Sequence, residues 1–442
     1  MPMSYRERLE KVIPGGAHTY SRGWDQFPSN APEILIRGKG PHVWAADGKK
    51  YVDYGMGLRS IVLGYADRGV SRAALRGLQL GQNLTRPAVI ELEAAELFTS
   101  IVDSVEMVKF TKTGSAAVSG AIKLARGFTQ REKILVCRQH PFFSYDDWFI
   151  SSTPMKLGIP KGVAELIFAF DYGNARQLSD LLIEHKGEIA AIILEPATDV
   201  GPSSGIDSFR PSKENFLTEV EALAREHGAV FILDEMITGF RYSLHGAQSL
   251  YNVKPDLTTF GKAMGNGLPI SAIGGRREIM ELGAINKPGV ERLFLLSSTH
   301  GPELASLSAM IHVVTRLKKS NDLSHVRQYG EELIKRLNDV STAHGLEKNL
   351  VFYGHSASPY FKVMDDNGEI SLGLRTLMAQ EMVNQGVLMP WIALSSAHGD
   401  RQLAKTVNAL DKAARTLKLA LKSNYSDYLI GPELKPVFRK FN

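Results

Sequence analysis

Cysteine is nearly absent from this chain, because Cys137 is the only one among 442 residues. A single thiol excludes an internal disulfide framework and a zinc site built from cysteines, and we predict no metal site. The longest apolar runs, such as residues 189–194, suit one strand and are far too short to span a membrane. Four of the first ten residues are charged and no apolar stretch follows them, so we expect no secretory signal. These absences favour a cytoplasmic protein without a membrane partner.

Long blocks of lysine and arginine are also missing. The chain has 52 basic and 47 acidic residues, which leaves a net charge of +5. That charge is small for this length and gives no basis for a nucleic-acid partner. Apolar residues make up 44% and charged residues 22%, which is typical of a folded globular protein and excludes wholesale disorder.

The chain does contain an alternation of short apolar runs and amphipathic stretches between about residues 60 and 314. Strands that are buried on both faces of a parallel sheet have continuous apolar runs of this kind. The pattern predicts an α/β fold in which residues 60–314 form a large domain with a mostly parallel sheet flanked by helices. The apolar runs lie at 108–110, 133–136, 190–194 and 229–233, and the amphipathic stretches at 116–126 and 214–227.

Two further segments are expected to form a smaller α+β domain. Residues 1–59 form its N-terminal part, with strand-like pieces at 33–37 and 42–44. Residues 315–442 form its C-terminal part and contain three long amphipathic helices. We place these helices at about 322–344, 371–385 and 402–422.

The first candidate site is Thr113-Gly114-Ser115, between the run at 108–110 and a helix expected to begin near Ala116. The first turn of a helix presents unpaired N–H groups and the positive end of the helix dipole, and a glycine permits close approach to the backbone. The segment is therefore a candidate phosphate cradle. Alone, it also fits a plain strand-to-helix turn with Ser115 as the N-cap residue.

Asp234 marks a second candidate site, at the end of the buried run 229–233. Ligands of open α/β sheets gather beyond the carboxyl ends of the strands, where an aspartate can hold a cationic ring nitrogen. The alternative is a helix cap formed by Asp234 or Glu235.

Lys262 marks the third candidate site. It lies among glycines and apolar residues in the segment 258–269. A lysine that is desolvated in such a setting has a lowered pKa and can form a Schiff base with an aldehyde. The alternative is a plain surface-loop lysine.

Together the three sites supply, in chain order, the parts that pyridoxal phosphate (PLP) requires. Around them the sequence closely resembles the class III, fold-type I PLP aminotransferases, and among these the glutamate-1-semialdehyde 2,1-aminomutase branch. The resemblance extends from about residue 5 to about residue 422. Its most specific pieces are residues 12–16 (VIPGG), 194–196 (LEP), 234–241 (DEMITGFR) and the Lys262 segment.

The resemblance implies PLP as the cofactor, with pyridoxamine phosphate as an intermediate. It implies that Lys262 forms the Schiff base and moves the proton, and that Asp234 keeps the pyridine nitrogen protonated. Glu195 corresponds to a glutamate on the strand preceding Asp234, which supports the site residues without touching the cofactor itself. Gly114 and Ser115 correspond to the phosphate cradle.

Further cofactor contacts follow from the resemblance. The family's ring-stacking aromatic corresponds to Phe142, or to Phe143 if the alignment slips by one residue. Met236 occupies the usual valine position against the other ring face, where a thioether is chemically suitable. Ser298 or Thr299 corresponds to a hydroxyl that reaches the phosphate of the neighbouring subunit. The resemblance therefore implies a homodimer or higher oligomer with a shared active site.

The chain departs from the aminomutase branch in three ways. Ala116 replaces an acidic residue of the cradle motif, which costs at most about 1 kcal/mol locally. Leu58 replaces a tryptophan and Arg59 adds a cation near the expected mouth of the site, so we do not expect glutamate semialdehyde as the substrate. Arg22 aligns with an arginine that meets a substrate carboxylate. Arg22 and Arg59 are thus candidates for holding an acid or a phosphate, or they are ordinary exposed arginines.

The sequence therefore predicts an aminotransferase that takes an amino group from a small-molecule donor and passes it to a carbonyl acceptor. Two alternatives use the same carbanion chemistry, namely an intramolecular aminomutase and a racemase or epimerase. A non-catalytic homologue would be expected to lack Lys262 or Asp234, and both are present. His18, His140 and His300 are expected to line the site or to be structural, because the lysine moves the proton.

Overall fold

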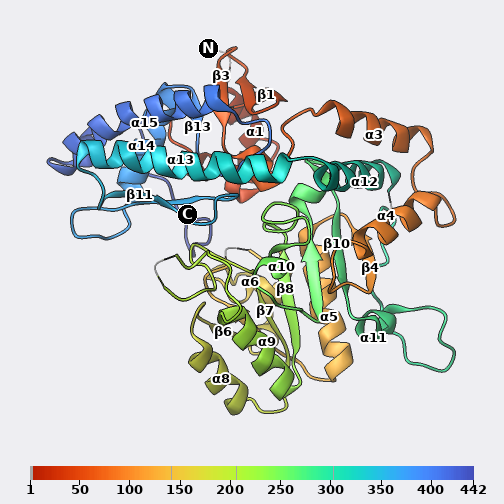
Figure 1. Ribbon diagram of the computed structural model, residues 1–442. Helices are drawn as coiled ribbons and strands as arrows, with labels where there is room; N and C mark the ends of the chain where they lie inside the picture. The colour runs from red at the N-terminus through yellow and green to blue at the C-terminus, as the bar shows by residue number, and fades with distance from the viewer. Residues whose placement is uncertain (1–2, 141, 206, 302) are drawn as a thin grey trace. The chain divides into compact units, whose positions relative to one another are not determined.

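The computed structural model describes residues 3–140, 142–205, 207–301 and 303–442 (Figure 1). The chain forms two units. The small unit comprises residues 1–67 and 321–437, and the large unit comprises residues 68–320 and 438–442. These boundaries lie several residues beyond the expected ones at 59/60 and 314/315. Residues 60–67 belong to the small unit because Tyr65 forms a β-bridge with Gly40, and because Val62 accepts a hydrogen bond from Ser396.

The large unit is built around a seven-stranded sheet with the order β4-β10-β9-β8-β7-β5-β6. β10 is antiparallel to both of its neighbours, and the remaining pairs are parallel. The expected α/β class with a mostly parallel sheet is thus confirmed. The strands are β4 (Met107–Thr111), β5 (Lys133–Cys137), β6 (Ile167–Phe170), β7 (Ile189–Leu194), β8 (Val230–Glu235), β9 (Leu257–Phe260) and β10 (Ser271–Gly275).

The central strands form the core of the large unit. Every residue of β7 and β8 is buried, which explains their uninterrupted apolar sequence. Helix α5 packs across β7, β9 and β10, and α9 packs on β7 and β8. The helices of this unit are α3 (Arg68–Gln79), α4 (Val89–Thr99), α5 (Gly114–Thr129), α6 (Asp147–Ile150), α7 (Lys161–Ala164), α8 (Ala175–Glu184), α9 (Phe216–His227), α10 (Ala247–Leu250), α11 (Arg277–Met280) and α12 (Leu304–Lys319).

The small unit joins the two ends of the chain in one sheet, with the order β1-β2-β3-β13. Strand β13 pairs in parallel with β3, so the C-terminal segment completes a sheet that the N-terminal segment begins. In Figure 1 the red N-terminal strands accordingly lie beside the blue C-terminal helices. The elements are α1 (Tyr5–Glu10), β1 (Leu35–Lys39), β2 (His42–Ala45), β3 (Lys50–Asp53), α2 (Met56–Arg59), α13 (Asp322–His344), β11 (Leu350–Tyr353), β12 (Tyr360–Val363), α14 (Leu372–Asn384), β13 (Val387–Leu388) and α15 (Asp400–Leu421).

Candidate active site

Asp234 lies near the end of β8 and is almost completely buried. Its Oδ1 accepts hydrogen bonds from the backbone N–H of Met236 and from the hydroxyl of Thr259 on β9, both at 2.9 Å. Burial, followed by the negative charge of Glu195, raises the pKa of Asp234 to about 7, while Lys262 acts in the opposite direction. A cation placed beside this carboxylate would stabilise its ionised form, as a protonated pyridine ring does.

Glu195 directly follows β7, and its side chain is buried beside His140. His140 Nδ1 lies 3.6 Å from Glu195 Oε1, and the backbone N–H of Glu195 donates to Nε2 at 3.1 Å. Burial acts to lower the pKa of His140, but Cys137 and then Glu195 outweigh it, so the pKa is raised above its ordinary value. Glu195 therefore interacts with Asp234 and with the buried imidazole of His140. The sequence contains no sign of this pair, since 55 positions separate its members.

Met236 connects the cradle segment with the lysine segment. A Cβ atom added to Gly114 would lie 3.0 Å from Met236 Sδ, and one added to Gly261 would lie 2.6 Å from it. The two glycines are thus in contact with the thioether, one at the start of α5 and one directly before Lys262. This contact brings two of the three predicted sites together.

Gly261 allows a test of this packing. An alanine there would place its Cβ 2.6 Å from Met236 Sδ and 2.7 Å from Ser271 Oγ. We expect Gly261→Ala to lower the free energy of unfolding by about 1–3 kcal/mol, because both neighbours have to move. Gly162→Ala is the control, since its Cβ would meet nothing within 4 Å. Denaturant unfolding of both variants gives the answer, and equal stabilities would show that the thioether is loosely held.

The cradle helix begins earlier than expected. Helix α5 begins at Gly114, and Thr113, not Ser115, is the N-cap residue, because its hydroxyl accepts the N–H of Ala116 at 3.2 Å. Gly114 and Ser115 therefore lie in the first turn, where backbone N–H groups have no acceptor within the helix. Ser115 is buried, and its Oγ accepts the N–H of Tyr145 at 3.2 Å. This arrangement suits a bound phosphate.

The two candidate stacking rings differ in exposure. Phe143 is 2% exposed and packs against His140 and Phe149, with ring centroids 5.1 and 5.5 Å apart. Phe142 is 46% exposed and meets Phe149 edge-on at 5.8 Å. A ring that stacks on a cofactor needs one accessible face, so the structure favours Phe142 for this predicted role.

Lys262 begins a single turn of 3-10 helix, η4 (Lys262–Gly265), just after β9. Its side chain is half-buried, and its φ of +38° lies in the left-handed region. That conformation costs a residue with a side chain about 1–2 kcal/mol, and such strain is typical of functional positions. The charge of Lys262 acts on Asp234, so both residues belong to the same site.

Four further predicted residues are Ser298, Thr299, Arg22 and Arg59. Ser298 and Thr299 are exposed in a segment of the large unit without helix or strand. Their exposure leaves both hydroxyls accessible to a neighbouring subunit, which stays a prediction. Arg22 and Arg59 belong to the small unit. Arg22 is exposed, whereas Arg59 is half-buried against the rings of Tyr360 and Trp391.

Two further features can be stated for the described part of the chain. No group of three histidine, cysteine, aspartate or glutamate side chains is placed to hold a metal ion. In the same residues, no helix combines the length and the apolar character needed to cross a membrane.

Comparison with known proteins identifies the fold and then the family. The structure superimposes on FumI of Sphingopyxis sp. MTA144, solved in its PLP internal aldimine form, with a TM-score of 0.83 and 26% identity over 98% of this chain and 97% of that one. An omega-transaminase from Sphaerobacter thermophilus gives a TM-score of 0.82 with 23% identity over 93% and 96% of the two chains. The fold is that of the fold-type I PLP transferases.

The sequence comparisons identify a family within the fold-type I PLP transferases. Residues 27–350 match the model of the class III aminotransferases. The glutamate-1-semialdehyde 2,1-aminomutase of Aquifex aeolicus (strain VF5) is 32% identical over 438 residues, which cover 93% of this chain and 99% of that protein. The chain therefore belongs to the class III aminotransferases and is an enzyme of this PLP-dependent family. The family resemblance, the enzyme class and the cofactor expected from the sequence are confirmed.

Proposed function

We propose that this enzyme is an aminotransferase that moves an amino group from a small-molecule donor to a carbonyl acceptor. The observation that carries the proposal is the grouping of Asp234, Glu195, Met236 and Lys262 at the carboxyl ends of β7, β8 and β9, beside the first turn of α5. Bound PLP supplies a protonated pyridine ring that takes up negative charge when a C–H bond beside the amino group is broken. The chain's own residues bind, orient and move protons around it.

Asp234 would hold the proton on the ring nitrogen. Its Oδ1 is already fixed by Met236 and Thr259, so the carboxylate has one orientation before the cofactor arrives. The opposite charge of the ring would offset the burial that raises the pKa of Asp234. Gly114 and Ser115 would bind the phosphate with first-turn N–H groups and a hydroxyl.

Lys262 would anchor the cofactor through Nζ and, once displaced by the amino donor, remove the proton from the donor carbon and later return it. Met236 and Phe142 would cover the two faces of the ring. Met236 is fixed by its contacts with the two glycines, whereas Phe142 has an accessible face.

An intramolecular aminomutase is the second candidate. The 32% identity to the Aquifex aeolicus aminomutase over nearly the whole chain favours it. Two residues argue against glutamate semialdehyde as the substrate. Leu58 stands where the aminomutases carry a tryptophan, and Arg59 adds a cation.

A single half-reaction distinguishes the two candidates. The purified holoenzyme is mixed with L-glutamate, and separately with L-alanine, without an acceptor. An aminotransferase converts its cofactor to pyridoxamine phosphate and releases an equal amount of keto acid. The opposite result is no conversion by either donor, together with isomerisation of glutamate-1-semialdehyde by the pyridoxamine-phosphate form. That result would establish the aminomutase.

The proposed shared site predicts subunit complementation. Lys262→Ala subunits are mixed with subunits that carry both Ser298→Ala and Thr299→Ala, under conditions that exchange subunits. A hybrid dimer then has one site with an intact lysine and the partner's intact hydroxyls. After random exchange we expect about a quarter of wild-type activity, well above either variant alone. No gain on mixing would place the hydroxyls and the lysine in the same subunit's site.

A further inference from the structure

Lys112 lies in the two-residue connection between β4 and α5, directly before the phosphate cradle. Its Nζ lies 2.5 Å from Glu303 Oε2 and 3.2 Å from the carbonyl oxygen of Pro269. The side chains of Lys112 and Glu303 are 21% and 19% exposed, so water and salt screen this ion pair less than one at the surface. Lys112 therefore joins three segments of the large unit that are far apart in the sequence.

Glu303 is itself fixed by the helix that follows it. It is the N-cap residue of α12, because its Oε1 accepts the N–H of Ser306 at 3.2 Å, and its Oε2 accepts the Ser306 hydroxyl at 2.7 Å. Burial acts to raise the pKa of Glu303, but the bonds from Lys112 and Ser306 outweigh it and lower this pKa, so the carboxylate stays ionised. Helix α12 packs on η4, the turn that begins with Lys262. Lys112 is thus connected through Glu303 to the element that carries Lys262.

Pro269 gives a second and shorter connection to the Lys262 segment. It lies between η4 and β10, near the end of that segment. Strand β10 is antiparallel to β4 with Ser271 opposite Thr111, so the chain before β10 runs beside the chain after β4. The bond from Lys112 Nζ to the Pro269 carbonyl extends this pairing beyond the two strands.

These contacts lie between the parts of the chain that would hold the two ends of the cofactor. The phosphate and the aldehyde of PLP are attached to one aromatic ring, so their separation is nearly fixed. The cradle and Lys262 therefore have to be held at a matching separation. Met236 fixes this spacing at one place, by its contacts with Gly114 and Gly261. The contacts of Lys112 fix it at a second place.

We propose that Lys112 is a positioning residue for the cofactor. Through Glu303 and Pro269 it holds the cradle and the Lys262 segment at the separation that bound PLP requires. This order is present before the cofactor binds, so binding does not have to supply it. The role rests on the proposed function, in which the cradle binds the phosphate and Lys262 anchors the cofactor.

A direct contact between Lys112 and the phosphate is the competing explanation, because ammonium groups bind phosphates. The two explanations predict different effects of Glu303→Gln. The glutamine keeps an oxygen for the N–H of Ser306 but removes the charge that holds Lys112. If Lys112 acts through Glu303, this change weakens PLP binding. If the released ammonium group binds the phosphate, PLP binding is unchanged or becomes tighter.

Equilibrium binding of PLP and of pyridoxal, which lacks the phosphate, to the full-length apoprotein tests the proposal. We expect Lys112→Met and Glu303→Gln each to weaken PLP binding about tenfold, because either change removes the ion pair. Pyridoxal uses only the lysine end, so its affinity should change by less than about twofold. The double variant should bind PLP no more weakly than the weaker single variant, because the two residues act as a unit. Lys112→Arg keeps the cation and should retain PLP affinity within about threefold.

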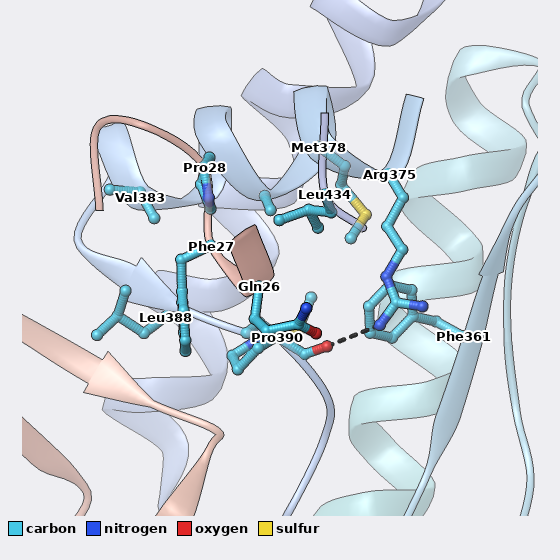
Figure 2. A pocket seen from close by; sticks show the side chains of 12 residues that line it. Gln26, Phe27, Pro28, Phe361, Arg375, Met378, Val383, Leu388, Pro390 and Leu434 are labelled. Carbon is cyan, nitrogen blue, oxygen red and sulfur yellow. Dashed lines mark hydrogen bonds between the residues drawn. The ribbon is translucent and has the colours of Figure 1, made fainter. Parts of the chain in front are cut away.

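Two variants control for lost charge and for lost stability. Lys123→Met removes an exposed cation of α5 and should bind PLP and pyridoxal as the wild type does. Arg375→Met removes a half-buried cation of the small unit, whose guanidinium packs on the Phe361 ring and donates to the carbonyl of Pro390 at 2.9 Å (Figure 2). This change should lower the melting temperature but leave the ratio of PLP affinity to pyridoxal affinity unchanged. A lowered ratio in the Lys112 and Glu303 variants therefore reports positioning and not stability.

The remaining outcomes contradict the proposal in distinguishable ways. An unchanged affinity ratio in Lys112→Met and in Glu303→Gln would overturn the positioning role. Weaker PLP binding in Lys112→Met alone would replace it by direct contact with the phosphate. A wild-type chain that binds pyridoxal as tightly as PLP would show that the cradle does not hold the phosphate, and would overturn both the proposed site and this role of Lys112. Because binding is measured without turnover, a failure of the proposed amino transfer leaves the result unaffected.

Discussion

Lys262→Ala should abolish covalent attachment of PLP and lower turnover by at least about 1,000-fold, because no other amine replaces its roles as anchor and base. Borohydride reduction followed by peptide mapping measures the attachment. The wild-type chain should carry the label on Lys262, and the variant should carry none. Lys254→Ala removes an exposed lysine of the same unit and should retain both label and turnover.

The local structure explains why this loss is specific. The backbone of Lys262 lies in the left-handed region directly after β9, and this presents the side chain to the site that contains Asp234. Alanine has a similar conformational cost at φ +38°, so the folded structure should be retained, with a melting temperature close to that of the wild type. Label or turnover remaining in a well-folded variant would show that Lys262 is not the anchor.

Asp234→Asn should have opposite effects on the empty protein and on the loaded enzyme. In the chain without cofactor, the pKa of Asp234 is raised from 3.8 to about 7. Between these pH values the folded chain holds the proton more tightly than the unfolded chain, so wild-type stability falls as the pH rises towards 7. Asparagine keeps the hydrogen bonds to Oδ1 and never ionises. At pH 8 the free energy of unfolding of the variant apoprotein should therefore exceed that of the wild-type apoprotein by on the order of 2 kcal/mol.

The same change should disable the holoenzyme. A neutral amide cannot hold the proton on the ring nitrogen, and we expect kcat to fall by at least about 100-fold. Denaturant unfolding of both apoproteins at pH 3.5 and pH 8 measures the first effect, and single-turnover kinetics measure the second. Distant titrating groups are common to both chains and cancel in the comparison, whereas Glu195 and Lys262, which interact with Asp234, contribute to the measured difference. The difference in stability between the variant and the wild type should be larger at pH 8 than at pH 3.5. An equal difference at the two pH values would contradict the raised pKa of Asp234.

Four of the seven strands of the large sheet, and the long helices, were predictable because their signals are local. The apolar runs at 190–194 and 229–233 became β7 and β8, and the helix placed at about 322–344 became α13 with the same bounds. Strand β10 escaped prediction because it contains two glycines, and β13 because it has only two residues. Such short elements are fixed by their neighbours in the sheet and not by their own composition.

In the candidate site, too, residues within local motifs were predictable, whereas contacts between distant residues were not. Lys262, Asp234 and the cradle lie in motifs that can be recognised in the sequence. By contrast, the N-cap at Thr113 depended on which of two nearby hydroxyls accepts the N–H of Ala116. The pairings of His140 with Glu195 and of Lys112 with Glu303 depended on partners that are distant in the chain, up to 191 positions away. A sequence pattern carries no information about such contacts.

The parallel pairing of β3 with β13 has a consequence for the order of synthesis. The large unit is almost continuous in the chain, whereas the small unit needs residues from both ends. At about 5–20 residues per second, a ribosome adds the chain between β3 and β13 in roughly 20–60 s. During that interval β3 lacks its parallel partner, and its free edge is open to wrong pairing. Most of the large unit is therefore synthesised before β13, and the edge of β3 is covered only after the C-terminal segment has been made.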